Sequence, residues 1–173
     1  CVRRHPGGLC SGQLTDLVPG ATIAGFVRRN PAFRPQKGRK PVILIGAGTG
    51  VAPLAGFLRA NRRRQPMHLY FGARAPQSDL LYDAELRDWQ AAGQLTKLTT
   101  AFSRHGPKTY VQDALRTDAS ELARLIGAGA QIMVCGGRDM AGAVRDALTE
   151  ILAPLGQTPA TLKAEGRYAE DVY

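Results

Sequence analysis

One short segment near residue 45 constrains the fold more than any other part of the chain. The apolar run PVILI at residues 41–45 is followed by GAGTGVAP at residues 46–53, and then by a helical pattern over residues 53–64. Glycines let the backbone turn tightly and bring N–H groups close to an anion, and a helix N-terminus adds the positive end of its dipole. The segment therefore predicts a strand, a phosphate-binding loop and a helix in succession.

The loop matches neither of two common nucleotide-binding fingerprints. The dinucleotide pattern G-x-G-x-x-G would need glycine at position 51, where the chain has Val51. A Walker A loop would need Gly-Lys-Ser/Thr, which does not follow. A plain connection between a strand and a helix remains an alternative, so the loop alone indicates a phosphate group without identifying it.

Strand and helix patterns alternate after residue 40. Alternation of this kind favours an α/β domain, an open parallel sheet with helices on both faces. In such a sheet ligands bind beyond the carboxyl ends of the strands. We expect strands at residues 42–45, 67–71, 95–102 and 131–135, and helices at 53–64, 82–92, 110–115, 119–126 and 139–152.

The first 35 residues lie outside this alternation. Residues 20–27 have strand character, and a polar connector at residues 36–40 separates them from the first strand of the sheet. We therefore expect residues 1–35 to be the tail of a different, β-rich domain and residues 36–173 to form the α/β domain. Because the chain begins with Cys1 rather than Met, we also expect it to be a piece of a longer polypeptide.

The composition argues against several classes of protein. No apolar run is long enough to span a membrane and no secretory signal opens the chain, so we expect membrane attachment only through segments outside it. The three cysteines, Cys1, Cys10 and Cys135, are too widely spaced for a zinc site or a disulfide framework. We expect no metal and a reducing, cytoplasmic location.

The net charge of +9 is compatible with an ordinary solvated surface, but it can also indicate a negatively charged ligand or partner. The basic runs at residues 62–64 and 37–40 leave nucleic-acid binding open as a less favoured alternative, because aromatic residues are few and no nucleic-acid-binding motif is present. We expect a phosphate-rich ligand or an acidic electron-transfer partner instead, and no nucleic acid.

Basic and hydroxyl side chains follow the second and third expected strands. NAD-binding proteins place an acidic residue after the second strand to hold the ribose hydroxyls, whereas this chain has Arg74. Hydroxyl, guanidinium and ammonium groups suit a phosphate monoester, and a tyrosine ring can stack on adenine. The set predicts a pocket for the 2′-phosphate of NADP(H), with a solvated basic loop as the alternative. Its members after the third strand are Ser103, Arg104, Lys108 and Tyr110.

Cys135 ends the fourth expected strand, directly before two glycines. A cysteine in a strand is usually a small hydrophobic residue, but this one lies at the expected ligand edge. We expect it to contact a bound cofactor and to assist hydride transfer by position rather than as a nucleophile, because a thiol is a weak acid.

Several segments occur together in a recognisable order. They are residues 46–53, 71–74, 101–104, 108–112, 134–136 and 166–173. In this order they resemble the ferredoxin–NADP reductase family, most closely its diflavin branch, which includes the cytochrome P450 reductases and the sulfite reductase flavoproteins. Residues 7–14 and 26–35 resemble the end of that family's FAD-binding barrel. The resemblance implies a ferredoxin reductase-type NADP-binding domain preceded by the tail of an FAD-binding β-barrel.

The resemblance also implies which residues contact NADP(H). The pyrophosphate would lie against the glycine loop, with Arg74 beside the phosphates, and the 2′-phosphoadenosine end beyond the third strand. The matching residues are Gly48, Thr49, Gly50, Arg74, Ser103, Arg104, Lys108, Tyr110, Gln112, Cys135 and Gly136.

Flavin contacts follow from the same resemblance. In this family the final aromatic residue, here Tyr173, stacks on the isoalloxazine and moves aside for the nicotinamide. Cys135 and Asp171 match residues that help hydride pass to flavin N5. The residues that would contact the FAD pyrophosphate are Gly8, Leu9, Cys10 and Ser11.

The resemblance implies an NADPH-dependent flavoprotein oxidoreductase. NADPH would pass hydride to FAD, and electrons would leave singly to an acceptor domain or protein of flavodoxin-like, haem or iron–sulfur type. The alternative is an NADP-binding fragment with no activity of its own, because most of the flavin barrel would lie outside the chain.

Overall fold

The computed structural model describes residues 2–173, which divide into two compact units at Pro31 and Ala32. The first unit contains one helix, α1 (Leu9–Thr15), and a long extended segment. The strand character of residues 20–27 is not realised, because in the described chain these residues pair with no other strand. An extended segment needs a hydrogen-bonded neighbour to become a stable strand.

The second unit is built on a five-stranded sheet with the strand order β3-β2-β1-β4-β5. All neighbouring strands are parallel, as the alternating pattern predicts. The strands are β1 (Val42–Ala47), β2 (Met67–Ala73), β3 (Lys97–Phe102), β4 (Gln131–Gly136) and β5 (Tyr168–Val172).

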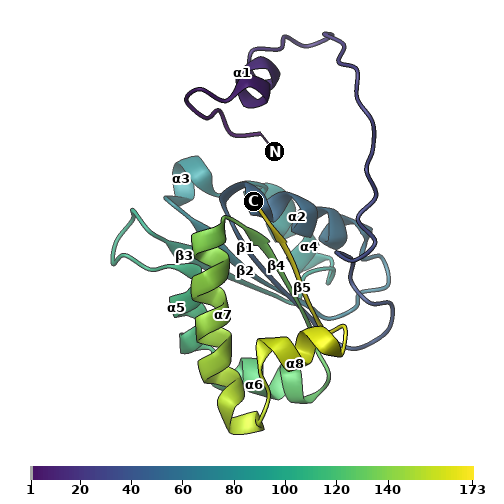
Figure 1. Ribbon diagram of the computed structural model, residues 1–173, viewed down its shortest axis with the longest axis vertical. Helices are drawn as coiled ribbons and strands as arrows, with labels where there is room; N and C mark the ends of the chain where they lie inside the picture. Colours follow the sequence, from purple (N-terminus) through teal and green to yellow (C-terminus); the bar gives the residue numbers. More distant parts are fainter. Residues whose placement is uncertain (1) are drawn as a thin grey trace. The chain divides into compact units, whose positions relative to one another are not determined.

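Helices cover both faces of this sheet, as Figure 1 shows. One face carries α2 (Val51–Ala60) and α4 (Asp83–Ala91). The other face carries α5 (Val111–Thr117), α6 (Ala119–Gly127), α7 (Arg138–Leu152) and α8 (Pro159–Ala164). Shorter turns are η1 (Gly48–Gly50), α3 (Pro76–Asp79) and η2 (Ala153–Leu155).

The central strand β1 shows why this arrangement is stable. Ile43 and Ile45 pack into the core beneath α5 to α8, whereas Val42 and Leu44 pack on the opposite side beneath α2 and α4. All four side chains are fully buried, and burying each contributes about 1.5–3 kcal/mol. A strand covered on both faces is apolar throughout, which explains the run at residues 41–45.

Each expected strand and helix of the α/β domain forms, with small shifts at the ends. The helix expected to reach Arg64 ends at Ala60. There the buried side chain of Asn61 donates to the carbonyl oxygens of Gln65 and Gln94, both at 2.8 Å. An asparagine side chain that satisfies turn backbone in this way competes with continuing the helix.

The second unit begins slightly before the boundary expected after residue 35. Phe33 is buried in the core, and its ring lies 5.7 Å from that of Phe57, measured between centroids. Within residues 2–173 no helix combines the length and apolar character needed to cross a membrane.

The strand β5 was not expected from the sequence, yet it carries the candidate site residue Asp171 and is followed directly by Tyr173. Its start is held by Arg167, whose carbonyl oxygen accepts from the amide of Ile132 at 2.7 Å and whose Nε donates to the carbonyl oxygen of Ala130 at 3.2 Å. These contacts fix its register against β4, where Cys135 lies opposite Asp171.

Candidate functional site

The glycine loop lies between β1 and α2, as predicted. Gly48–Gly50 forms the one-turn helix η1, which runs directly into the first residue of α2. Gly48 has φ +55°, a left-handed conformation that other residues adopt at a cost. The first turn of α2 carries no acidic side chain, so the positive end of its dipole is not neutralised locally.

Close packing joins this loop to the end of β4. A Cβ atom on Gly50 would lie only 2.1 Å from the carbonyl oxygen of Cys135 and 2.9 Å from Cα of Gly136. Only glycine fits this contact without a shift of the backbone. Because Gly50 has no side chain, the loop packs directly against the backbone of Cys135. The backbone amides of the loop also remain accessible to a ligand.

Cys135 is the most buried of the chemically reactive candidates. Its side chain is 3% exposed. Burial, with a smaller contribution from the Asp171 carboxylate, raises the pKa of the thiol to about 11. The sulfur is therefore protonated at neutral pH, which makes it a poor nucleophile.

Tyr173 connects β4 to the glycine loop. Its backbone amide donates to the carbonyl oxygen of Gly136 at 3.2 Å. Its phenol oxygen lies 2.7 Å from Oγ1 of Thr49 in a hydrogen bond. The side chain remains 63% exposed, so it rests on the site while presenting its ring to the outside. Asp171, on the preceding strand β5, is also exposed.

The ends of β2 and β3 are joined through their backbones. The amide of Ser103 donates to the carbonyl oxygen of Ala73 at 3.0 Å, and that of Arg104 donates to the carbonyl oxygen of Arg74 at 2.8 Å. These bonds hold Arg74 beside Ser103 and Arg104, as the parallel sheet predicts. Arg74 and Ser103 are half-buried, whereas Arg104 is exposed.

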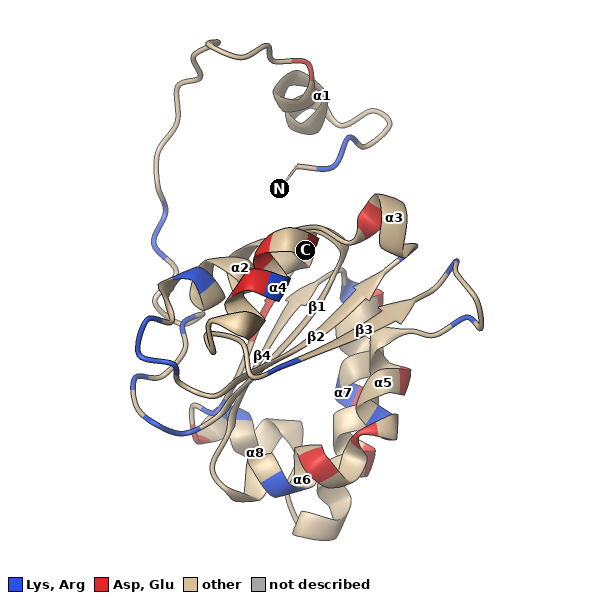
Figure 2. Ribbon diagram, turned by 180° about the vertical axis from the view of Figure 1, so that it is seen from behind, with Lys and Arg blue, Asp and Glu red and all other residues tan. Residues whose placement is uncertain are grey.

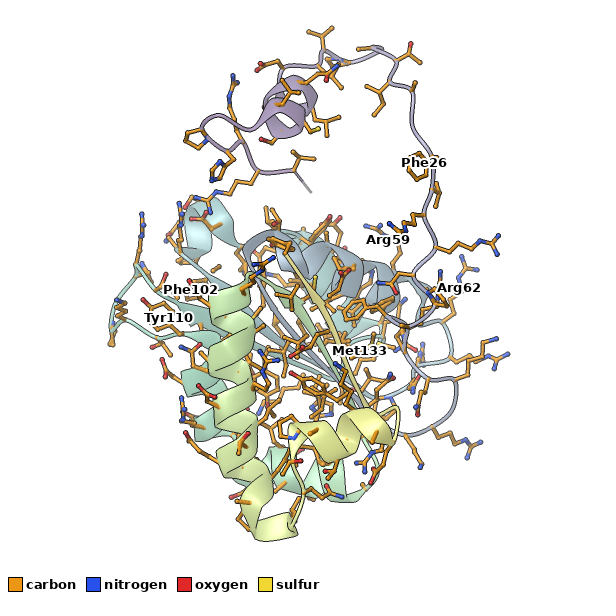
Figure 3. The ribbon with its side chains drawn as sticks, in the orientation of Figure 1. Phe26, Arg59, Arg62, Phe102, Tyr110 and Met133 are labelled. Atoms are coloured by element: carbon orange, nitrogen blue, oxygen red, sulfur yellow. The ribbon has the colours of Figure 1, made fainter. Side chains whose placement is uncertain are left out.

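The loop after β3 returns to the same edge. The amide of Thr109 donates to the carbonyl oxygen of Phe102 at 3.0 Å, which closes the loop that contains Lys108. The Lys108 ammonium lies 5.0 Å from the ring centroid of Tyr110. Figure 3 shows Phe102 and Tyr110 at this edge of the domain. Residues 101–112 contain no carboxylate, so the cluster is positively charged.

Tyr110 is fixed by a residue that the sequence analysis missed. Its backbone amide donates to Oδ2 of Asp113 at 2.8 Å, at the start of α5. An acidic residue three positions after the residue that precedes a helix is a capping signal, so the spacing from Tyr110 to Asp113 could have revealed this contact. Gln112 lies in the same first turn and is half-buried.

The candidate residues for the FAD pyrophosphate belong to the first unit, whereas all the other candidates, Tyr173 included, belong to the second. Gly8 precedes α1, and Leu9, Cys10 and Ser11 form its first turn. Ser11 Oγ donates to the carbonyl oxygen of Gly8 at 3.3 Å, and Leu9 is 86% exposed. Among the residues described, no group of His, Cys, Asp and Glu side chains could hold a metal ion.

Comparison with known proteins identifies the domain. A family described as "Oxidoreductase NAD-binding domain" matches residues 44–146. Nitric oxide synthase 3 from Sus scrofa is 38% identical over 187 residues, which cover 96% of this chain and 16% of that protein. NADPH–cytochrome P450 reductase from Homo sapiens is 40% identical over 170 residues, which cover 88% of this chain and 25% of that protein.

A third relative extends the comparison beyond animals. NADPH oxidoreductase A from Dictyostelium discoideum is 34% identical over 181 residues, which cover 96% of this chain and 28% of that protein. The chain thus spans 16–28% of the length of these three relatives. Together with the parallel sheet, these matches confirm the resemblance to diflavin reductases. The chain belongs to the oxidoreductase NAD-binding domain family.

Proposed function

We propose that this domain binds NADPH along the carboxyl edge of its sheet and presents the nicotinamide to a flavin. The observation that carries the proposal is the convergence of the glycine loop, Cys135 and Tyr173 through the Gly50 contact and the bond between Thr49 and Tyr173. Bound NADPH would supply a hydride, and FAD in the parent protein would accept it.

The pyrophosphate would bind to the glycine loop. The amides of Gly48, Thr49 and Gly50 precede a helix whose first turn lacks acidic residues, and such a helix start favours a bound anion. The Thr49 hydroxyl would become a phosphate donor once it leaves Tyr173. Arg74 adds a guanidinium at the end of the neighbouring strand β2.

The 2′-phosphate would bind beyond β3. Ser103, Arg104 and Lys108 supply the hydroxyl, guanidinium and ammonium donors that a phosphate monoester needs. No carboxylate in residues 101–112 competes for these donors. Tyr110 is 43% exposed and could stack on the adenine, with Gln112 beside it in α5. This set favours NADP(H) over NAD(H).

At the nicotinamide end, Cys135 would act through its shape and its neutral thiol. Because the pKa of the thiol is raised to about 11, the sulfur is uncharged. It can therefore pack against the nicotinamide ring without electrostatic repulsion of the transferred hydride. Asp171 lies opposite Cys135 in the sheet and would hold a negative charge near the reacting ring. Tyr173 would cover the flavin until the nicotinamide displaces it.

Electron delivery involves partners beyond this domain. The names of the relatives include a cytochrome P450 reductase, which supports an electron-acceptor partner, and we propose a haem, iron–sulfur or flavodoxin-like acceptor. FAD would contact Gly8, Leu9, Cys10 and Ser11 in the first unit. We propose a cytoplasmic location, since the exposed thiol of Cys10 is typical of a reducing compartment.

Parallel calorimetric titrations with NADP⁺ and NAD⁺ test the nucleotide site. We expect tighter binding of NADP⁺. Arg104→Ala should cost about 1.5–3 kcal/mol of NADP⁺ binding, the contribution of a charged hydrogen bond, and leave NAD⁺ unchanged. Arg87→Ala is the matched control, because Arg87 is exposed on α4 and paired with Asp83. Equal affinities for the two nucleotides would contradict the 2′-phosphate pocket.

A further inference from the structure

A second group of basic side chains lies at the opposite edge of the sheet from Cys135. It comes from the two segments that precede β1 and β2, together with the last turn of α2. In Figure 2 blue segments gather on these loops. We call this group the amino-edge basic surface. Its members are Lys37, Arg39, Lys40, Arg59, Arg62, Arg63 and Arg64.

Among the described residues, six of these seven cations have no acidic partner. Arg59 lies 3.7 Å from a carboxylate oxygen of Glu85. Within residues 2–173, no ion pair involves any other member of the surface. Four arginines on other helices are paired, in Arg87–Asp83, Arg116–Glu150, Arg124–Glu121 and Arg145–Glu170. Uncompensated charge concentrated on one edge produces a positive potential that attracts an external anion.

Side-chain hydrogen bonds hold the two loops of the surface together. Asn61 is 6% exposed, and its side chain both donates to the carbonyl oxygen of Gln65 and accepts from its amide. The Gln65 side chain in turn donates to the carbonyl oxygens of Gln36 and Lys40, at 3.1 Å and 2.8 Å. The cations are thus presented on a preformed platform, which lowers the entropy cost of binding.

A shallow cavity of about 450 Å³ opens within this surface. Its lining has no carboxylate and consists of Arg59, Arg62, Arg64, Trp89, Ala92 and Gln94. The Arg59 guanidinium lies 5.6 Å from the centroid of the Trp89 ring, a cation–π contact that orients it. Figure 3 shows Arg59 and Arg62 on the same side of the domain.

We propose that the amino-edge basic surface docks a protein segment rich in aspartate and glutamate. Guanidinium groups match carboxylates with paired hydrogen bonds. Trp89 is only 8% exposed, so it offers no open ring face for a nucleobase. The loops at residues 36–40 and 61–64 present no large exposed apolar side chain, so the surface has nothing to insert into a lipid bilayer.

Docking here is separate from the nucleotide site. A strand rises about 3.3 Å per residue, so the length of β1 separates the two edges by roughly 20 Å. An acidic segment bound at the amino edge would leave the glycine loop and Tyr173 accessible. The surface would therefore anchor a partner rather than receive electrons.

Fluorescence anisotropy with a labelled poly-glutamate peptide tests this inference on the full chain. We expect salt-sensitive binding that Arg62→Glu and Arg64→Glu each weaken about tenfold or more, the effect of a lost charged hydrogen bond. Lys163→Glu is the matched control, because Lys163 is exposed on α8, forms no ion pair within residues 2–173 and gives the same change in charge. It should leave peptide affinity within about twofold. Saturating NADP⁺ should not displace the peptide, and NADP⁺ affinity should be the same in all three variants.

Other results would overturn the inference. Equal losses of peptide affinity in Lys163→Glu and Arg62→Glu would show that the peptide responds to the net charge of the protein alone. Displacement of the peptide by NADP⁺ would show that the peptide binds in the nucleotide site. Tighter binding of a single-stranded oligonucleotide or of phosphatidylserine vesicles, lost in Arg62→Glu, would assign the surface to a different polyanion. No measurable peptide binding at low salt would exclude the acidic segment. None of these outcomes depends on whether NADP⁺ is preferred over NAD⁺.

Discussion

Replacing Gly50 with alanine tests the packing that joins the glycine loop to β4. The added Cβ would lie 2.1 Å from the carbonyl oxygen and 2.6 Å from the carbonyl carbon of Cys135, and 2.9 Å from Cα of Gly136. All three are backbone atoms of a strand that pairs with β1 on one side and β5 on the other. Unlike a side chain, they cannot rotate away, so the loop or the strand must shift.

The size of the effect follows from two opposing contributions. Gly50 has φ −61° and ψ −14°, which alanine adopts without strain, so the loss of glycine flexibility alone would stabilise the protein by about 0.4–1 kcal/mol. Overpacking typically costs about 1–3 kcal/mol and sometimes more. Because the clash is with backbone, we expect a net loss of about 2 kcal/mol, or about 4–8 °C in Tm for a chain of this length.

Gly56→Ala, on the helix α2 that follows Gly50, is the matched control. A Cβ at Gly56 meets nothing within 4 Å, so alanine should raise the free energy of unfolding by about 0.5–1 kcal/mol. Urea unfolding followed by circular dichroism measures both variants. If Gly50→Ala is as stable as Gly56→Ala, the argument that this loop requires a residue without a side chain is refuted.

Three further outcomes follow from the structure. Iodoacetamide should label exposed Cys10 much faster than Cys135 in the folded protein, because burial raises the pKa of the Cys135 thiol to about 11. Peptide mass spectrometry measures both rates, and comparable labelling of the two cysteines would contradict the prediction. Burial lowers the pKa of His68 below its ordinary value of 6.5, so the unfolded chain binds the proton first and the free energy of unfolding should fall as pH drops below about 6.5. His68→Gln should reduce that slope in urea titrations at a series of pH values, and an unchanged slope would exclude His68 as its source. Tyr173→Phe removes the hydroxyl that bonds Thr49, so NADP⁺ affinity should rise by up to about fivefold, about 1 kcal/mol; calorimetry showing weaker binding would contradict a competition for Thr49.

The core strands could be predicted because a strand that is buried on both faces is a continuous run of apolar residues in the sequence. The apolar runs that form most of β1 and β4 are buried on both faces, although β4 begins with the polar residue Gln131. By contrast, β5 contains Glu170 and Asp171 and is only partly buried, so its sequence lacks the apolar pattern of a strand. It forms because β4 offers a free edge and Arg167 fixes the register. Such tertiary support is not visible in local sequence.

The candidate site divides in the same way. The positions of Arg74, Ser103 and Arg104 could be predicted because parallel strands bring their carboxyl ends to one edge. The bond between Thr49 and Tyr173 could not, because it joins residues 124 positions apart through a strand that the sequence did not reveal. The close contact of Gly50 with the Cys135 carbonyl could not be predicted either, since no spacing rule links a loop glycine to the backbone of another strand.

The position of β5 has a consequence for how the site opens. As the last strand of the sheet it is hydrogen-bonded on one side only, and its side chains are much less buried than those of β1. Unzipping its last residues from β4 would expose little apolar surface, so this margin is where local opening costs least free energy. Tyr173 could therefore swing away by fraying of the sheet edge while β1 and the glycine loop stay folded. Under the proposed function, the gate of the site would be the end of this strand rather than a separate lid.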